Sequence, residues 1–311
     1  MFSWLRHHAN RSALPTPPPA WTSAPEQSHV YGRFSEASEE DCDRAHSFCA
    51  RRPVEPSRLL PSSDIETIAK EGNNAWGLEF HHTDSSFSER ETFLGAIHNQ
   101  SKSHSGTGIV TKVETSKACK DCCLISNLPL MGGLYYRPQT HNRGVYFELT
   151  IHEMNGVIAI GTVCRPYPHF RLPGWHRLSA ALHLDDMRKF YENPNGGQES
   201  GFWGAIGGRP PVAGDTIGCG YEFGTGGTLF FTFNGHRLVP NAFKGLYLGD
   251  AHDVYAAIGV CGENAFTVNF GGDFFKWLPA NEWGWRLDAH VGNLSGPRTL
   301  GTLVEDLPAY T

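Results

Sequence analysis

The chain has 311 residues, 40% of them hydrophobic and 19% charged, which is ordinary for a globular protein and enough for a sizeable core. Its formal net charge is −6 and it has no dense run of Lys or Arg, so it lacks a basic field that would attract phosphates, and we expect no nucleic acid partner. No stretch approaches the roughly 18 consecutive apolar residues of a transmembrane helix, so we expect no membrane span in this chain.

The first 60 residues contain a proline-rich stretch (LPTPPPAW) and an acidic run (SEASEEDCD). Neither the period of a strand nor that of a helix is sustained along them. Such a segment cannot bury enough apolar surface to offset the entropy lost on ordering. We therefore expect residues 1–60 to form a disordered arm.

A short helix is predicted after this arm, in the stretch PSSDIETIAKEG. It places Ile65 and Ile68 on one face and offers Ser62, Ser63 or Asp64 as the N-cap. Short runs rich in β-branched and aromatic residues follow it. We assign residues 61–118 to this helix and to lead-in strands.

Two runs after residue 144 have the patterns of β-strands. VYFELTIHE at 145–153 alternates, with apolar side chains mainly on one face, which indicates a half-buried strand. VIAIGTV at 157–163 is apolar on both faces and follows Asn155-Gly156, a dipeptide typical of a two-residue hairpin turn. We expect both faces of this second strand to be covered.

Four further runs of this kind follow along the chain. They are TIGCGYEF at 216–223, TLFFTF at 228–233, VYAAIGV at 254–260 and AFTVNFG at 265–271. No helix-length pattern separates them, which excludes a fold of alternating strands and helices. The predicted fold class is all-β, an antiparallel β-sandwich.

Five stretches, taken in order, resemble the successive strands of a SPRY domain. They are VYFELTIHE, VIAIGTV, RLPGWHRLSAALHLDD, GDTIGCGYEFGTGGTLFFTFNGHRL and FTVNFGG. The resemblance implies a SPRY-type sandwich, which we assign to residues 119–275, followed by a short flexible C-terminal tail at 276–311. The stretch RPYPHFRLPGWH at 165–176 is similar to the RanBPM-like branch, and most closely to fungal endosomal and vacuolar SPRY adaptors of a WW-domain HECT ubiquitin ligase.

This resemblance implies a non-enzymatic adaptor without a cofactor, facing the cytoplasm at the endosome or vacuole. Its SPRY loops would bind a client protein. The adaptors hold their ligase through short PY motifs, and the chain ends in LVEDLPAYT, in which Leu307, Pro308 and Tyr310 match LPxY. The preceding GNLSGPRTLG is rich in glycine and polar residues, so the motif can extend into a polyproline-II ligand for a WW domain.

The stretch at 165–176 supplies the candidate client contacts. Tyr167, Phe170, Arg171 and Trp175 are of the residue types that dominate binding hot spots. Loops at the end of a sandwich are held by a rigid scaffold, which suits them to recognition. For Trp175 the alternative is that it packs inward and fixes the loop.

Asp185 and Asp186 are adjacent carboxylates that could divide the roles of an acid and a base. Neighbours on a strand point to opposite faces, so we expect no cooperating catalytic pair. The resemblance implies instead that the two aspartates help to shape a loop surface for binding.

Other chemistry is disfavoured by spacing. The glycines at 218–227 do not follow G-x-G-x-x-G and precede a strand, so no dinucleotide cradle is expected. Cys119, Cys122 and Cys123 form a single C-x-x-C without a second pair, so Cys123 is expected to open a buried strand rather than to bind zinc. We predict no catalytic residues and no metal ligands.

Two other functions stay open. A RanBPM-like scaffold would continue into helical LisH and CTLH regions, which the residues after the last predicted strand do not resemble. A lectin-like binding sandwich would need an aromatic shelf, for which Trp203, Trp283 and Trp285 are the candidates.

Overall fold

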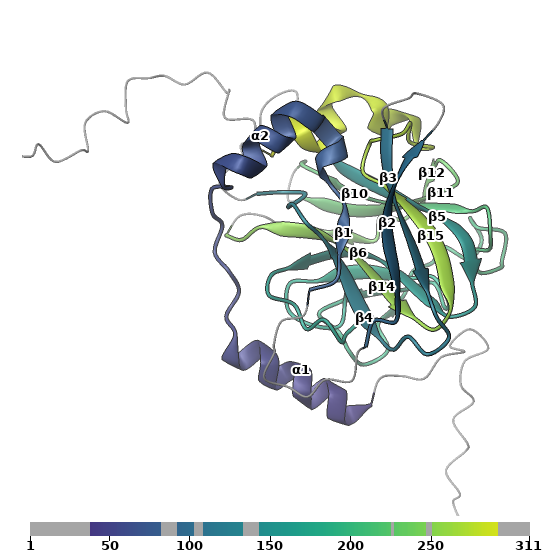
Figure 1. Ribbon diagram of the computed structural model, residues 1–311. Helices are drawn as coiled ribbons and strands as arrows, with labels where there is room; N and C mark the ends of the chain where they lie inside the picture. Colours follow the sequence, from purple (N-terminus) through teal and green to yellow (C-terminus); the bar gives the residue numbers. More distant parts are fainter. Residues whose placement is uncertain are drawn as a thin grey trace, which may run out of the picture.

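The computed structural model describes residues 38–81, 92–102, 108–132, 143–224, 227–246 and 251–291. These residues form two packed antiparallel sheets, with a helix at each of two positions on the outside (Figure 1). The predicted all-β antiparallel sandwich is confirmed.

Sheet A has seven strands in the described part of the chain. In spatial order they are β1 (Leu78–Glu79), β4 (Cys122–Ser126), β14 (Val254–Cys261), β6 (Val157–Cys164), β7 (Ala180–His183), β8 (Arg188–Tyr191) and β9 (Gln198–Glu199). Strand β4 contains the cysteine pair Cys122-Cys123 and is buried throughout, as predicted for this stretch.

Sheet B has eight strands among the described residues. Its order is β12 (His236–Arg237), β11 (Thr228–Phe233), β10 (Thr216–Glu222), β5 (Gly144–Met154), β15 (Asn264–Asn269), β3 (Gly108–Thr115) and β2 (Gly95–Lys102), with β13 (Phe243–Lys244) paired to β11. The six strand runs predicted after residue 144 are all present, within a few residues of their expected ends.

The main core lies between the sheets and follows from the alternation of the strands. Sheet B contributes Phe147, Leu149 and Phe266, and sheet A contributes Ile158 and Ile258; each is fully buried. Full burial of an apolar side chain of this size is worth roughly 1.5–3 kcal/mol. The outer faces of both sheets also carry apolar side chains, and other parts of the chain cover them.

The outer face of β5 is covered in its first half, where the alternation predicted solvent. Tyr146 packs against Trp277, with the ring centroids 5.1 Å apart, and Glu148 accepts a hydrogen bond from the backbone N–H of Lys276 at 3.0 Å. The covering segment continues from these residues through three short 3₁₀ helices, η2 (Leu278–Asn281), η3 (Trp283–Trp285) and η4 (Leu287–Ala289). The prediction of a flexible tail from residue 276 is therefore wrong for residues 276–291, because their aromatic side chains seal sheet B.

The predicted short helix is confirmed as α2 (Ser62–Glu71), which continues into η1 (Gly72–Ala75). Its predicted cap is wrong. Pro61 is the N-cap residue, no side chain caps the helix, and the Pro61 carbonyl accepts from the backbone N–H groups of Asp64 and Ile65. Proline supplies a fixed φ here, so a Ser or Asp side chain is not needed to start the helix.

A second helix, α1 (Glu39–Arg51), lies in the segment predicted to be disordered. Ser38 caps it by accepting from the backbone N–H of Asp41, and Ala45 and Phe48 are buried against the sandwich. The prediction of disorder up to residue 60 is therefore wrong from residue 38 onward, because two apolar side chains were enough to dock a helix. Figure 1 shows the connection from α1 running along the side of the sandwich to α2. Residues 1–37 lie outside the described part of the chain.

Candidate binding surface

The loop that joins β6 to β7, residues 165–179, covers the outer face of sheet A. Side chains such as Ile125, Val163 and Tyr255 point outward from the sheet and pack against Tyr167 of this loop. A second small cluster joins Val157 of β6 to Trp175 of the loop. The prediction that both faces of β6 are covered is confirmed, because the loop supplies the second cover.

Two of the four loop residues predicted to contact a client face the sheet. Tyr167 is 1% exposed and its hydroxyl donates to the Leu172 carbonyl at 2.6 Å. Burial raises the pKa of the Tyr167 phenol. Trp175 is 8% exposed and packs inward, which was the alternative considered for it. The prediction that Tyr167 and Trp175 contact a client directly is wrong, because their rings pack against the apolar outer face of sheet A.

The other two, Phe170 and Arg171, lie beneath α1. The Arg44 guanidinium of α1 stands 3.7 Å from the centroid of the Phe170 ring. Arg171 is 1% exposed, stacks over Trp175 at 4.3 Å and donates from Nε to His176 Nε2 at 3.0 Å. In this structure the chain's own helix covers both residues, and their role as client contacts stays a prediction.

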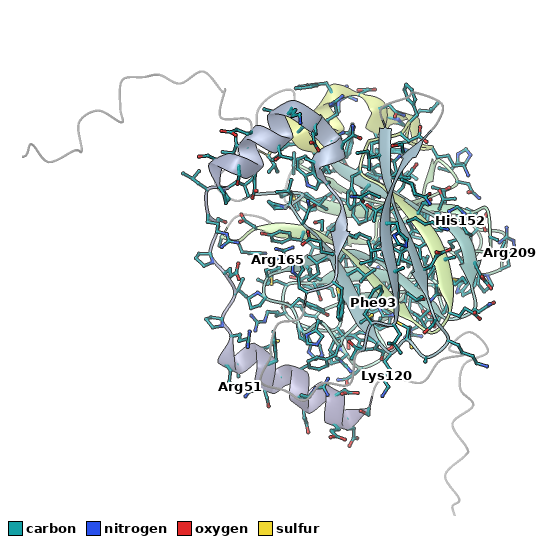
Figure 2. The ribbon with its side chains drawn as sticks, in the orientation of Figure 1. Arg51, Phe93, Lys120, His152, Arg165 and Arg209 are labelled. Atoms are coloured by element: carbon teal, nitrogen blue, oxygen red, sulfur yellow. The ribbon has the colours of Figure 1, made fainter. Side chains whose placement is uncertain are left out.

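Arg177 fixes the C-terminal end of α1. Its Nη2 donates to the carbonyl of Cys49 at 2.8 Å and also to that of Arg52. These carbonyls belong to the last turn, where a helix has no intrahelical donors to offer, and a cation is favourable there. The side chain of Arg51 is labelled at the same end of the helix in Figure 2.

The centre of this interface is positively charged. The rings of His46 on α1 and His176 on the loop are 5.2 Å apart and nearly perpendicular. Burial, followed by the charges of Arg171, His46 and Arg177, lowers the pKa of His176 to about 3. His176 is therefore neutral here at physiological pH and can accept the hydrogen bond from Arg171.

Three buried guanidinium nitrogens at this interface lack a hydrogen-bond partner. They are Nε of Arg44, Nη1 of Arg171 and Nη1 of Arg177. A buried donor without a partner loses its hydration and gains nothing in exchange, and the cost is greater for charged groups. The fit of α1 to the loop is therefore polar but incomplete.

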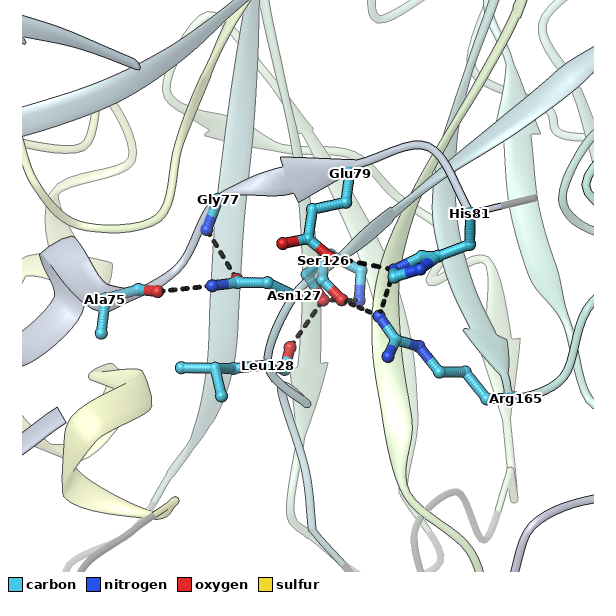
Figure 3. A network of polar contacts seen from close by, with 9 residues as sticks. Ala75, Gly77, Glu79, His81, Ser126, Asn127, Leu128 and Arg165 are labelled. Carbon is cyan, nitrogen blue, oxygen red and sulfur yellow. Dashed lines mark hydrogen bonds and ion pairs between the residues drawn. The ribbon is translucent and has the colours of Figure 1, made fainter. Parts of the chain in front are cut away.

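A network around Arg165 anchors the start of the loop (Figure 3). Its Nη2 donates to the Ser126 carbonyl and lies 2.9 Å from His81 Nε2, and His81 in turn is 3.2 Å from a carboxylate oxygen of Glu79. Burial, and then the charge of Arg165, lowers the pKa of His81. Next to it, Asn127 donates to the Ala75 carbonyl at 2.8 Å. These contacts tie the loop to β1 and β4 and hold it in place.

Asp185 and Asp186 lie in the turn between β7 and β8, so the assumption that they stand on a strand is wrong. Asp186 accepts from the backbone N–H of Arg188 at 2.9 Å, which closes the turn. Asp185 Oδ1 is buried without a partner, and burial, then the neighbouring Asp186, raises the pKa of Asp185 to about 7.

The tryptophans proposed as a lectin-like shelf are in different surroundings. Trp285 is buried and its ring lies 4.9 Å from that of Trp277 and 5.8 Å from that of Phe230. Trp283 is exposed, and Trp203 packs partly against the main core. The structure therefore does not support a shelf built from these three residues, because Trp285 is used to seal sheet B.

Two sequence signals bear on the position of α1 and on the covered face of sheet A. Ser38 is followed by acidic residues at 39–41, and the pattern of a capping residue before a negative first turn is typical of a helix start. The outward-facing apolar side chains of β6 likewise indicated that something must cover sheet A. Neither signal shows that the loop and α1 share that role.

A two-sheet antiparallel sandwich with a loop surface held on one outer face defines a binding module of the SPRY type. The SPRY domain family model matches residues 144–273 of this chain. The chain therefore carries a SPRY domain, which is a protein-interaction fold.

Curated relatives come from fungi. Protein ssh4 of Sclerotinia sclerotiorum is 36% identical over 186 residues, which is 58% of this chain and 31% of that protein. A SPRY domain-containing protein of Schizosaccharomyces pombe is 33% identical over 187 residues, 59% of this chain and 42% of that protein. Protein SSH4 of Coccidioides immitis is 27% identical over 284 residues, 90% of this chain and 49% of that protein.

The chain thus spans about a third of the length of the first of these relatives and about half of the last. Among solved structures, a crystal structure of a human SPRY domain matches 52% of this chain and 92% of its own length, with 23% identity and a TM-score of 0.38. In the described part of the chain, no helix combines the length and the apolar character needed to cross a bilayer.

Proposed function

We propose that this chain is a non-enzymatic adaptor that links client proteins to a WW-domain HECT ubiquitin ligase in endosomal or vacuolar protein sorting. The observation that carries the proposal is the SPRY domain at residues 144–273, since this fold is a protein-interaction module. Its likeness to the fungal ssh4 proteins supports the adaptor role. The chain would act by proximity on the cytoplasmic face of these membranes.

The client would be held by the SPRY loops. Of the four predicted loop contacts, Phe170 and Arg171 are the two that lie beneath α1 rather than against the sheet, which supports them as contacts once that helix is replaced. Asp185 and Asp186 shape the neighbouring β7–β8 turn and would border the same surface. Tyr167 and Trp175 would contribute by fixing the loop from beneath.

The ligase would be held by the motif Leu307-Pro308-Ala309-Tyr310, which lies outside the described residues. An LPxY segment suits the aromatic groove of a WW domain because a polyproline-II strand is ordered at little entropic cost. Such a short contact gives an affinity on the order of micromolar, which a second contact would raise by avidity.

The test is a titration of purified WW domains of a HECT ligase with a peptide of residues 303–311 and its Tyr310→Ala form. We expect saturable binding by the wild-type peptide and a loss of at least tenfold on substitution. In the full chain, Tyr310→Ala should abolish pull-down of the ligase and leave the thermal melt unchanged. Equal binding by the two peptides, or none by either, would overturn the ligase link.

A further inference from the structure

Helix α1 is attached to the sandwich by a small contact area. Of its 13 residues, Ala45 and Phe48 are the two that are buried. The ion pair between Arg44 and Asp41 lies within the helix and is exposed to solvent, so it does not attach α1 to the sandwich. A helix of this length is marginal in water on its own. Its helical state therefore depends on docking, and neither of its two buried side chains belongs to the main core between the sheets.

The surface beneath α1 recognises features that many helices share. We call it the helix-docking surface and define it as Phe170, Arg171, His176 and Arg177. Arg177 donates hydrogen bonds to carbonyls at the C-terminal end of the helix, which every helix presents. The face of the Phe170 ring packs against a guanidinium of the helix, that of Arg44. A small residue followed three positions later by an aromatic one, as in Ala45 and Phe48, fills the apolar part.

The helix-docking surface is only partly satisfied by α1. Arg171 and Arg177 each keep one buried guanidinium nitrogen without a partner. Two α1 side chains lie near Arg171: Asp41, whose carboxylate already pairs with Ser38 and Arg44 within the helix, and Cys42, which offers no carboxylate. Arginine forms its strongest hydrogen bonds with carboxylates, often through two nitrogens at once. A helix with an acidic side chain at the position of Cys42, free to pair with Arg171, would match the surface better than α1 does.

We propose that the helix-docking surface is the site of this SPRY domain for an acidic amphipathic helix of a client protein, and that α1 is an intramolecular occupant which the client helix displaces. Charge complementarity selects the client over a second copy of the chain, because another α1 would leave the same arginine nitrogens unpaired. The inference rests on the proposed function only in taking the SPRY domain as the client-binding part.

The experiment uses the full chain as receptor and labelled peptides as probes. The receptors are the wild type and Phe48→Ala, in which α1 loses its larger buried side chain. The probes are a peptide of residues 38–52, the same peptide with Cys42→Glu, and the same peptide with Phe48→Ala as the matched control. Fluorescence anisotropy reports binding, and hydrogen exchange of β6 and β14 reports whether the sandwich of the receptor is intact.

We expect the Phe48→Ala receptor to bind the 38–52 peptide at least tenfold more tightly than the wild type does, because its own helix no longer competes. The Cys42→Glu peptide should bind at least threefold more tightly than the unmodified one, and an added Arg171→Gln change in the receptor should remove this gain. The control peptide should bind at least tenfold more weakly. If hydrogen exchange shows that Phe48→Ala disturbs the sandwich, Arg44→Ala takes its place as the opened receptor.

Two results would overturn the proposal. Equal affinity of the wild-type and opened receptors for the 38–52 peptide would show that α1 does not occupy a competitive site. Equal affinity of the unmodified and Cys42→Glu peptides would show that the arginines do not select an acidic helix. Neither measurement involves Tyr310 or a ligase, so the ligase link can fail while this site holds, and the reverse.

Discussion

Asp185 is a half-buried residue whose carboxyl Oδ1 is buried without a hydrogen-bond partner. Its pKa is raised to about 7 by burial and by Asp186, from an ordinary value of 3.8. A raised pKa in the folded state means that this group favours folding below about pH 4 and that its contribution is lost as the pH rises through 7. At pH 8 the Asp185 carboxylate is therefore charged in surroundings that stabilise this charge less well than water does.

We predict that Asp185→Asn stabilises the protein at pH 8, by on the order of 1–2 kcal/mol once partial solvent access is allowed for. The gain should shrink as the pH falls and would vanish below about pH 3, where the wild-type carboxyl is protonated in both states. Urea unfolding at pH 8, 6 and 4.5 measures this. Asp43→Asn, on the exposed side of α1, is the control and should change little. An equal gain at all three pH values would contradict the assignment.

At the scale of elements, α1 docks through a neutral histidine that lies near two arginines. Burial, and then the charge of Arg171, are the largest causes that lower the pKa of His176 to about 3. If release of α1 lets His176 return toward its ordinary pKa of 6.5, the released state binds a proton that the docked state does not. Docking is then fully stable above pH 6.5 and weakens as the pH falls toward 3.

We predict that the docking free energy falls by up to about 2 kcal/mol between pH 7 and pH 5. Hydrogen exchange of the α1 amides should accelerate over this range, while the amides of β6 and β14 stay protected. His176→Gln keeps a hydrogen-bond acceptor for Arg171 without titrating, so it should flatten the pH dependence of α1. The same acceleration in wild type and His176→Gln would place the titrating group elsewhere.

The elements differ in how far the sequence could predict them. The alternation of Val145, Phe147 and Leu149 is a local pattern, and the strand it predicts is present. By contrast, α1 shows two buried apolar residues in 13, too few for a periodic signal, and its stability comes from a loop more than 110 residues away.

The candidate site was harder still to predict. The aromatic residues and arginine of the β6–β7 loop have the composition of a binding hot spot, yet composition does not say which way a side chain faces. Tyr167 and Trp175 are taken up by sheet A, whereas Phe170 and Arg171 face outward onto α1. That division depends on the three-dimensional path of the loop and on α1, which lies far away in the chain.

At the scale of the whole molecule, the two ends of the described chain cover opposite faces of the sandwich in different ways. On sheet A, α1 lies over a loop that already covers the sheet, and it buries two side chains. On sheet B, Phe275, Trp277 and Trp285 lie directly on the strands and form a buried aromatic cluster with Tyr146 and Phe230. We therefore expect the fold to tolerate loss of the first cover and to depend on the second.

We predict that Trp285→Ala, which opens a cavity in this aromatic cluster, lowers the free energy of unfolding by about 3–5 kcal/mol. Phe48→Ala should cost little global stability, because sheet A keeps its loop. Urea unfolding gives the two values, and hydrogen exchange separates them further: Trp285→Ala should speed exchange throughout β5, β10 and β11, and Phe48→Ala only in α1. If both variants lowered the protection of the sandwich alike, α1 would be a structural part of the domain rather than a replaceable occupant of its binding surface.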